Sequence, residues 1–284
     1  MTDPAPLPPL IVEPVVRRAL EEDLGRAGDI TTDSIVPGDQ QGDGALVARA
    51  AGRAAGLAAA VTAFRLVDPA IEVTVHRPDG SDVAAGDTLA TLRGPARGLL
   101  TGERVALNFL GRLCGIATAT REAVRAVEGH PARIACTRKT TPGLRALEKH
   151  AVRLGGGVNH RFGLDDGVLI KDNHLATAGG VEPALAAVRA KQGHMVRVAI
   201  EVDTLDQLDT VLATGQADCV LLDNMAPDTL REAVRRANGR VVTEASGGLT
   251  PDSLRDVAAS GVDIISLGWL THSAPALDVA LDLA

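Results

Sequence analysis

VRVAIEVDTLDQLDTVLATGQADCVLLDNMAPDTLREAVRRANGRVVTEAS, residues 196–246, contains the strand–helix repeat that decides the fold of this chain. Its apolar runs VRVAIEV, CVLLD and VVTEA alternate with the helix-period segments LDQLDTVLAT and PDTLREAVRRA. RIACT and GVLIK upstream and DIISLG downstream continue the same rhythm. Short strands that are apolar on both faces indicate a parallel sheet covered by helices. We therefore expect a (β/α) barrel, with an open doubly wound sheet as the alternative.

The region before these repeats has a different pattern. Between residues 44 and 98, short apolar strands end in glycine turns, which predicts a small, mostly β unit with one helix near residues 55–67. A helix is expected at Val12–Asp23, and a long helical run at roughly Gly102–Glu128. We predict an N-terminal α/β sandwich domain over residues 1–112 and a barrel domain over 113–284. The last ~15 residues are free to return to the first domain.

Composition narrows the possible functions. The chain of 284 residues has a formal net charge of -7, 1% aromatic residues and no Tyr. Binding of single-stranded nucleic acid usually needs aromatic stacking platforms and a basic field, so we expect no nucleic-acid partner. Three distant cysteines without a CxxC pair are interpreted as buried free thiols: Cys114, Cys136 and Cys219. Without a signal-peptide pattern or a membrane-length apolar run, we expect no membrane association and a reduced, cytoplasmic location.

Charged side chains directly follow the apolar runs. Arg138 and Lys139 come after RIACT, and Lys171 comes after GVLI. Glu201 and Asp223 follow the next two runs in the same way. In a β/α barrel the carboxyl ends of all strands share one rim, and that rim carries the chemistry. We therefore expect these five side chains to meet at one mouth.

Residues 137–161 are basic although the chain as a whole is acidic. Glu148 is the only acidic residue there, among cations that include Arg138, Lys139 and Arg161. Arginine suits bidentate capture of a carboxylate or phosphate, and several cations at one mouth imply a substrate with several negative charges. Three further cations, Arg145, Lys149 and Arg153, lie on a predicted helix whose other side is apolar. We expect these three to face water or a partner subunit.

Acidic residues and glycine turns complete the predicted rim. Glu201 and Asp223 are interpreted as salt-bridge partners of the lysines or as a Mg²⁺ site shared with phosphate oxygens, and the two readings are compatible. Glycine turns at residues 246–248 and 267–268 suit a phosphate, because small residues let backbone N–H groups approach an anion. The GGG at residues 155–157 fits either a helix end or a mobile loop.

Several motifs, in this order and spacing, closely resemble the quinolinate phosphoribosyltransferase family. They cover nearly the whole chain from about Val12 onward: EDLGRAGDITTDSI, GERVALNFLGRLCGIAT, TRKTTPGLRALEKHAVRLGGGVNHRFGLDDGVLIKDNH, EVDTLDQL, VLLDNM, EASGG and LTHS. The resemblance implies an α/β fold, an incomplete (β/α) barrel preceded by a smaller α+β sandwich domain. It implies Mg²⁺-dependent transfer of phosphoribose from 5-phosphoribosyl-1-pyrophosphate to quinolinate. Pyrophosphate and CO₂ would leave, and nicotinate mononucleotide would form on the route to NAD.

The resemblance also implies roles for individual residues. The two quinolinate carboxylates would be held by Arg138, His160, Arg161 and Lys171. Lys139 would contact pyrophosphate or ribose, while Glu201 and Asp223 would face the ribose hydroxyls and hold Mg²⁺. The 5-phosphate would be cradled, with His272 nearby, by Ser246, Gly247, Gly248 and Gly268. The residues expected to take part in catalysis are Lys139, Lys171, Glu201 and Asp223.

The family resemblance extends to assembly. Its members are dimers or assemblies of dimers in which the small domain of one subunit covers the barrel mouth of the other. Arg104 would reach into the neighbouring subunit's site. Trp269, where a small residue is expected, and Cys114, where serine is more usual, depart from the family pattern.

Three other functions share single features of this sequence. A Schiff-base lyase would use Lys171 as its nucleophile at the same rim. A paralogous group linked to molybdate transport has a similar barrel, and the complete TRKT…NHR…KDNH set argues against it. A lipoyl or biotinyl carrier, suggested by DGSDVAAGDTLATLRG, needs a lysine at a hairpin tip, whereas the first lysine of the chain is Lys139.

Overall fold

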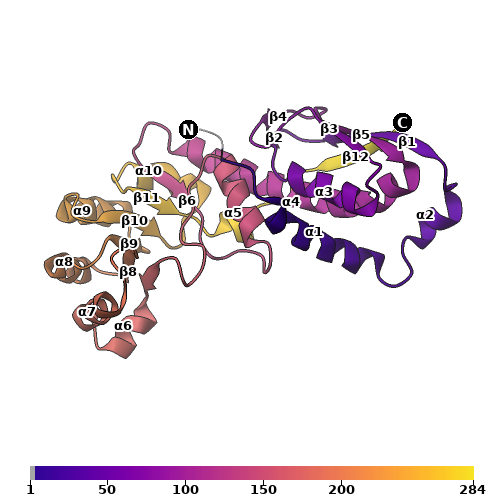
Figure 1. Cartoon of the computed structure of the whole chain (residues 1–284). Helices are drawn as coiled ribbons and strands as arrows, with labels where there is room; N and C mark the ends of the chain where they lie inside the picture. The colour runs from indigo at the N-terminus through magenta and orange to yellow at the C-terminus, as the bar shows by residue number, and fades with distance from the viewer. Residues whose placement is uncertain (1–3) are drawn as a thin grey trace. The chain divides into compact units, whose positions relative to one another are not determined.

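The computed structural model describes residues 4–284, which form two compact units. The first contains the chain up to Arg121, Thr140–Gly156 and Trp269–Ala284, and the second contains Glu122–Lys139 and Gly157–Gly268. Figure 1 follows the chain through both units. The first unit's first segment ends at Arg121, nine residues after the predicted boundary at 112/113, and both positions lie within one continuous helix, α4 (Ala96–Ala126).

The second unit is built on a parallel sheet of six strands. These are β6 (Arg133–Ala135), β7 (Val168–Ile170), β8 (Val198–Val202), β9 (Cys219–Asp223), β10 (Val242–Ser246) and β11 (Ile264–Ser266). Their order is β6-β11-β10-β9-β8-β7, so the first strand lies beside the last, as closure into a barrel requires. Among the described residues β6 and β7 are not paired with each other, which leaves the barrel incomplete. The predicted incomplete barrel is therefore confirmed.

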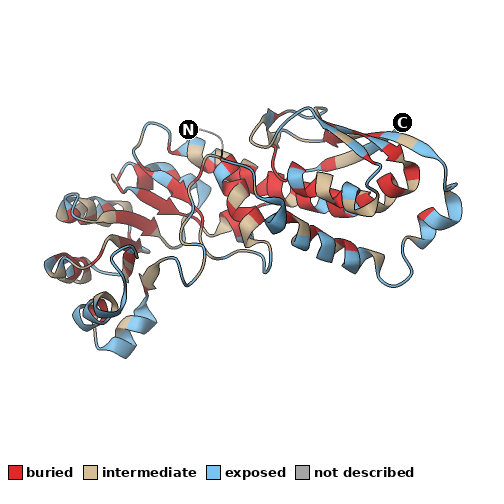
Figure 2. Cartoon of the chain, viewed as in Figure 1, coloured by how far each residue is buried: buried red, intermediate tan, exposed pale blue. Residues whose placement is uncertain are grey.

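Helices follow the strands of this sheet. They are α6 (Asp172–Ala178), α7 (Val181–Lys191), α8 (Leu205–Thr214), α9 (Pro227–Ala237), the 3₁₀ turn η1 (Pro251–Ser253) and α10 (Leu254–Ala258). Figure 1 shows α7, α8 and α9 side by side along the strands. Local signals explain their limits: the Thr204 hydroxyl accepts the Gln207 N–H at 3.2 Å to begin α8, and Gly215, with φ of 64°, ends it. Figure 2 shows the strands buried and these helices exposed on one side.

The first unit contains an antiparallel sheet with the order β12-β1-β5-β3. Its strands are β1 (Gln41–Ala48), β3 (Glu72–Val75), β5 (Thr88–Pro95) and β12 (Val279–Leu283), and β2 (Gly52–Arg53) pairs separately with β4 (Asp82–Val83). The helices of this unit, besides α4, are α1 (Pro9–Leu24), α2 (Ile30–Ile35), α3 (Leu57–Val67), α5 (Arg145–Leu154) and α11 (Trp269–His272). Because β12 pairs with β1 along Gly44–Ala48, the last strand of the chain completes the first unit's sheet.

Helix α5 corrects one prediction. Arg153 is exposed, but Lys149 is only 2% exposed and its neighbour Glu148 is fully buried. Glu148 and Lys149 pack inside the first unit, where Arg112 Nη2 lies 2.9 Å from Glu148 Oε1. The amphipathic pattern predicted the helix correctly. It did not predict that part of the polar side would be buried.

Gly155 follows the last residue of α5 and packs closely against α4. A Cβ added there would lie 2.5 Å from the Ala117 carbonyl oxygen and 2.6 Å from Thr120 Cβ. The first glycine of GGG therefore has a structural role at the helix end. No helix within residues 4–284 is long and apolar enough to cross a membrane.

Candidate active site at the barrel rim

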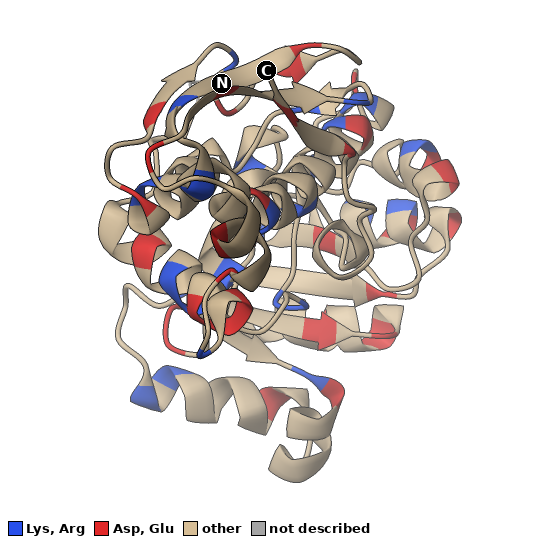
Figure 3. Cartoon of the chain, turned by 90° about the vertical axis from the view of Figure 1, so that its right-hand side faces the viewer, with Lys and Arg blue, Asp and Glu red and all other residues tan. Residues whose placement is uncertain are grey.

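The second unit carries its charged residues at the carboxyl ends of its strands. Arg138 and Lys139 follow β6, Lys171 follows β7, Glu201 lies near the end of β8, and Asp223 ends β9. Ser246 ends β10, and Gly268 comes two residues after β11. Figure 3 shows that the strands are mostly uncharged and that acidic and basic residues concentrate on helices and loops. The structure therefore places these predicted site residues at one end of one sheet.

Two carboxylates and one lysine meet at the ends of β7, β8 and β9. Lys171 Nζ lies 3.0 Å from Glu201 Oε2. Burial raises the pKa of Asp223, and the negative charges of Glu201 and Asp203 raise it further, while Lys171 and Lys139 act in the opposite direction. Asp223 therefore lies within reach of both acidic and basic side chains of the rim.

This acidic pair can supply part of a divalent-cation site. Within residues 4–284 no group of three or more His, Cys, Asp or Glu side chains could hold a metal by itself. Mg²⁺ often takes only one or two carboxylates and completes its shell with water and substrate phosphates. Burial and the nearby charges of Glu201 and Asp203 raise the pKa of Asp223, and a cation bound there would favour its charged form. Glu201 and Asp223 thus fit a magnesium ion that arrives with a phosphorylated substrate.

Two arginines of the same unit, Arg138 and Arg161, lie close enough for their charges to interact. Desolvation lowers the pKa of Arg161, the positive charge of Arg138 lowers it further, and Asp166 opposes them. Arg161 Nη1 donates to the Gly167 carbonyl oxygen at 3.0 Å, which fixes its side chain. Arg138 Nε is buried without a hydrogen-bond partner. A bound anion would accept a hydrogen bond from the buried donor and would reduce the repulsion between the two positive charges.

His160 lies close to a buried acid, Glu244, whose place at the end of an apolar run predicts a position at the rim but no role in binding or catalysis. Its Nδ1 accepts the Arg161 N–H at 2.8 Å, and its Nε2 lies 3.6 Å from Glu244 Oε1. Glu244 is 4% exposed, and burial raises its pKa. Cys219, which is only half-buried rather than buried as predicted, lies 3.9 Å from the other carboxyl oxygen. The acid within the otherwise apolar run VVTEA was the available signal for this cluster.

The glycine turn after β10 lies against the end of β9. Gly247 and Gly248 have φ values of 89° and 59°, a region that favours glycine. The Ser246 carbonyl oxygen accepts the Asn224 N–H at 2.9 Å. The turn leads to Thr250, which begins η1 through reciprocal bonds with Ser253. Small residues before a helical turn leave backbone N–H groups accessible to an anion.

The two remaining predicted residues, Arg104 and His272, belong to the first unit. Arg104 is exposed on α4 and lines a cavity of about 360 Å³ together with Asn108, Arg112 and Asp278. His272 ends α11, where its Nδ1 lies 2.6 Å from the Ser273 hydroxyl.

The fold and this rim define a protein of the barrel class that gathers basic and acidic side chains and glycine turns at the carboxyl ends of its strands. The chain belongs to the quinolinate phosphoribosyltransferase family. The model of the family's C-terminal domain matches residues 116–282, and that of its N-terminal domain matches residues 29–114. The recognition made from the motifs is therefore confirmed.

Named relatives resemble the chain over almost its full length. A probable carboxylating nicotinate-nucleotide pyrophosphorylase from Bacillus subtilis is 47% identical over 92% of this chain and 90% of its own. The Mycobacterium leprae enzyme of the same name is 45% identical over 94% and 95%. The nicotinate-nucleotide pyrophosphorylase structure from Francisella tularensis superposes with a TM-score of 0.93 at 36% identity, covering 98% of both chains. Human nicotinic acid phosphoribosyltransferase shares only the fold, at 17% identity and a TM-score of 0.63.

The geometry disfavours the Schiff-base alternative. A nucleophilic lysine must lose its proton, which requires desolvation or a cationic environment. The Lys171 side chain is 50% exposed and pairs with the Glu201 carboxylate at 3.0 Å, so it is neither desolvated nor surrounded by cations alone. Lys171 is therefore suited to bind an anion rather than to attack a carbonyl.

Proposed function

We propose that this chain transfers phosphoribose from 5-phosphoribosyl-1-pyrophosphate to quinolinate and removes one carboxylate as CO₂. The products would be nicotinate mononucleotide, pyrophosphate and CO₂, in NAD biosynthesis. The observation that carries the proposal is that cations and carboxylates follow or end neighbouring strands of one sheet: Arg138 after β6, Lys171 after β7, and Glu201 and Asp223 at the ends of β8 and β9. One rim thereby offers separate sites for a dianionic acid and for a metal–phosphate group.

Quinolinate carries two adjacent carboxylates and needs more than one cation. Arg138 has a buried Nε without a hydrogen-bond partner, and Arg161 has a side chain fixed at Gly167, so both are prepared to bind a carboxylate. Lys171 adds a mobile point charge from the next strand. His160 has both ring nitrogens directed at Arg161 and Glu244, so we assign it the smaller role of shaping the pocket floor.

The sugar donor would occupy the other half of the rim. Glu201 and Asp223 would hold Mg²⁺ and the ribose hydroxyls, and Lys139 would contact the pyrophosphate. Ser246, Gly247, Gly248 and Gly268 would surround the 5-phosphate with backbone N–H groups. Mg²⁺ neutralises charge on the departing pyrophosphate when it is bound.

The chemistry needs positioning and electrostatics rather than a nucleophilic side chain. As pyrophosphate leaves, the ribose gains oxocarbenium character, which the carboxylate of Glu201 or Asp223 stabilises. The ring nitrogen forms the new bond to the ribose and becomes cationic. The C–CO₂ bond next to it then breaks, the ring holds the electron pair, and a proton replaces CO₂ on carbon. No separate organic cofactor is required.

Stoichiometry tests this proposal. Purified protein with Mg²⁺, the sugar donor and quinolinate labelled in its 2-carboxylate should release labelled CO₂ and pyrophosphate in equal amounts with nicotinate mononucleotide. Nicotinate and nicotinamide serve as controls with one carboxylate and none. Labelled CO₂ without a mononucleotide, or no product from folded protein, would remove the proposal.

We further propose that the active form is a homodimer in which Arg104 completes the neighbouring site. The exposure of Arg104 on α4 supports this role. Subunit mixing tests it: Arg104→Ala and Lys171→Ala should each be inactive, and mixed dimers should regain activity because one site then has both residues. Mixtures that stay inactive after subunit exchange would contradict action across the dimer. The cytoplasmic location stays a prediction.

A further inference from the structure

Asn224, directly after Asp223, has an unusual backbone conformation. Among residues 4–284 only Asn224 and Asn238 are non-glycine residues with positive φ, at 53° and 46°. Asn238 follows helix α9, where a left-handed residue is a common helix end. Asn224 instead lies between β9 and α9, with no helix to end. Such a conformation costs on the order of 1 kcal/mol and persists where the surroundings impose it.

The contacts of Asn224 explain why the conformation is kept. Its side-chain Nδ2 donates to Asp223 Oδ2 at 2.6 Å. The donor must be the amide nitrogen, because an ionised carboxylate only accepts hydrogen bonds. Its backbone N–H donates to the Ser246 carbonyl oxygen at 2.9 Å. One residue thus connects the acid that ends β9 with the first residue of the glycine turn after β10.

The glycine turn fits closely over this contact. A Cβ added at Gly247 would lie 2.6 Å from Asn224 Cγ and 2.8 Å from Asp223 Oδ1, so no other residue fits without movement. Gly247 also has φ of 89°. The backbone of residues 246–248 therefore rests on the Asn224 side chain.

The two rim carboxylates are restrained in the same way. Lys171 binds Oε2 of Glu201 at 3.0 Å, and Asn224 binds Oδ2 of Asp223. Within residues 4–284 no group donates a hydrogen bond to Asp223 Oδ1. Each carboxylate thus has one oxygen held by a hydrogen bond from a neighbouring side chain.

We propose that Asn224 is a positioning residue that restricts Asp223 to binding through Oδ1 and holds residues 246–248 in their phosphate-binding shape. This inference rests on the proposed function, because it assigns the sugar donor to Asp223 and to the glycine turn. Asn224 itself does not contact the reacting atoms. Its loss should therefore weaken binding of the sugar donor and leave binding of the dicarboxylate unchanged.

Equilibrium titration separates these effects. Benzene-1,2-dicarboxylate has the two carboxylates of the substrate but no ring nitrogen, so it allows the sugar donor and Mg²⁺ to bind without reaction. We expect Asn224→Gly to weaken sugar-donor binding by about 10-fold, as expected for a lost hydrogen bond to a charged group. Binding of benzene-1,2-dicarboxylate alone should change less than about 2-fold. Ribose 5-phosphate without metal tests residues 246–248 alone, because it has the 5-phosphate but no pyrophosphate. Its binding should also weaken in Asn224→Gly.

Asn238→Gly is the matched control, because it makes the same substitution at the other left-handed Asn of the same unit. It should leave binding of all three ligands unchanged. Asn224→Asp preserves size and left-handed tolerance but replaces the donor by an acceptor, so it should weaken sugar-donor binding at least as much as Asn224→Gly.

Several results would overturn the inference. The first is an affinity for the sugar donor that is the same in Asn224→Gly and Asn238→Gly. The second is wild-type affinity for the sugar donor in Asn224→Asp. The third is an equal loss of affinity for the sugar donor and for benzene-1,2-dicarboxylate in Asn224→Gly, because it would indicate a general structural role. Wild-type protein that turns over quinolinate while these variants bind normally would leave the proposed function standing. Wild-type protein that binds no sugar donor would remove both.

Discussion

The two units of the molecule use charged side chains in opposite ways. In the first unit, Glu148 is fully buried, and both its oxygens have partners. Oε1 accepts from Arg112 Nη2 at 2.9 Å and from Nε at 3.1 Å, and Oε2 accepts from the Thr141 N–H at 3.0 Å. In the second unit, Asp223 and Arg138 lack such complete partners. Charges that are satisfied within the protein hold the fold, whereas charges left partly compensated are available to substrate.

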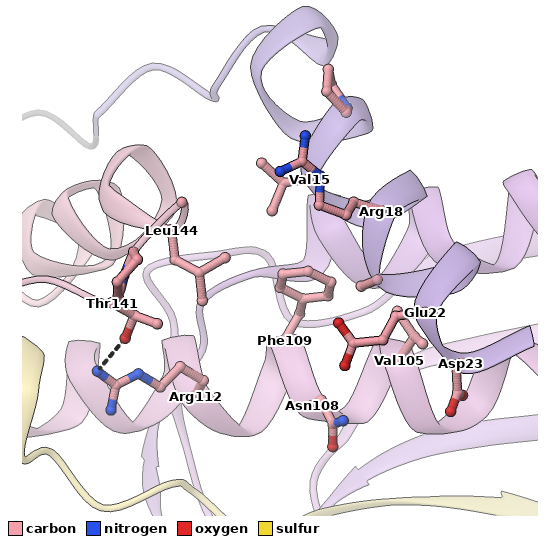
Figure 4. Close-up of a pocket in the computed structure, with 14 residues that line it drawn as sticks. Val15, Arg18, Glu22, Asp23, Val105, Asn108, Phe109, Arg112, Thr141 and Leu144 are labelled. Atoms are coloured by element: carbon pink, nitrogen blue, oxygen red, sulfur yellow. Dashed lines mark hydrogen bonds between the residues drawn. The ribbon is translucent and has the colours of Figure 1, made fainter. Parts of the chain in front are cut away.

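Arg112, the partner of Glu148, has hydrogen-bond acceptors on several parts of the first unit. Besides Glu148, it donates to the Thr271 carbonyl oxygen, to the Ala274 carbonyl oxygen at 3.3 Å and to the Thr141 hydroxyl at 3.4 Å. Figure 4 shows Arg112 directed at Thr141 along a cavity of about 570 Å³ formed by α1, α4 and residues 141–144. One side chain therefore joins α4, α5 and the segment that leads out of the barrel rim.

The largest expected effect breaks the buried pair of the first unit. Glu148→Ala leaves Arg112 without its carboxylate and the Thr141 N–H without an acceptor, so the free energy of unfolding should fall by about 3 kcal/mol. Urea unfolding measures this change. Glu148→Gln retains an acceptor and should lose less. A loss below about 1 kcal/mol for Glu148→Ala would show that the pair is not essential to the fold.

At the rim, removal of a carboxylate should lower activity but have little effect on stability. Glu201→Gln removes a charge next to the reacting sugar, and kcat should fall by about 100-fold. Its partner Lys171 is half exposed, so the free energy of unfolding should change by less than about 1 kcal/mol. Steady-state kinetics and urea unfolding on the same preparation test both statements. A Glu201→Gln variant that is fully active yet strongly destabilised would show that Glu201 serves the fold rather than the reaction.

Recognition of the dicarboxylate should depend on guanidinium geometry. Arg138→Lys keeps the charge but loses the planar pair of donors, so KM for quinolinate should rise by about 10-fold while KM for the sugar donor changes little. Arg153→Lys, on the exposed side of α5, is the matched control. Equal KM values for quinolinate in Arg138→Lys and wild type would contradict the role of Arg138.

The smallest expected effect concerns the buried acid under His160. Burial raises the pKa of Glu244 above its ordinary value of 4.5. The folded state therefore holds this proton more tightly, and stability falls as pH rises from 4.5 through the folded pKa, by at most about 1.4 kcal/mol per pH unit. Glu244→Gln should remove this dependence and gain stability relative to wild type as pH rises. Urea unfolding at several pH values tests it, and a pH-independent difference would show that Glu244 does not titrate.

The fold and most of the rim could be predicted because local pattern encodes them. Apolar runs such as CVLLD are buried strands, and the residues that follow them reach the rim through the geometry of a parallel sheet. Helix α6 was missed because DNHLATA has little apolar periodicity and begins through the His174 side chain, which accepts the Lys171 N–H at 2.9 Å.

Other features depend on tertiary contacts that no local pattern shows. The burial of Lys149 arises from packing within the first unit, and the left-handed conformation of Asn224 arises from the neighbouring loop after β10. Glu244 lies in a recognised strand, but its approach to His160 brings together residues 84 positions apart, from 160 to 244.

The most direct test of the account is the ratio of kcat/KM for quinolinate to kcat/KM for nicotinate, with the same sugar donor and Mg²⁺. If the rim charges bind both carboxylates, loss of one leaves part of the rim's positive charge unpaired, including the buried Nε of Arg138, and the ratio should exceed about 1,000. A ratio near one would show that the second carboxylate is not recognised, and that the cations at Arg138 and Arg161 serve another purpose.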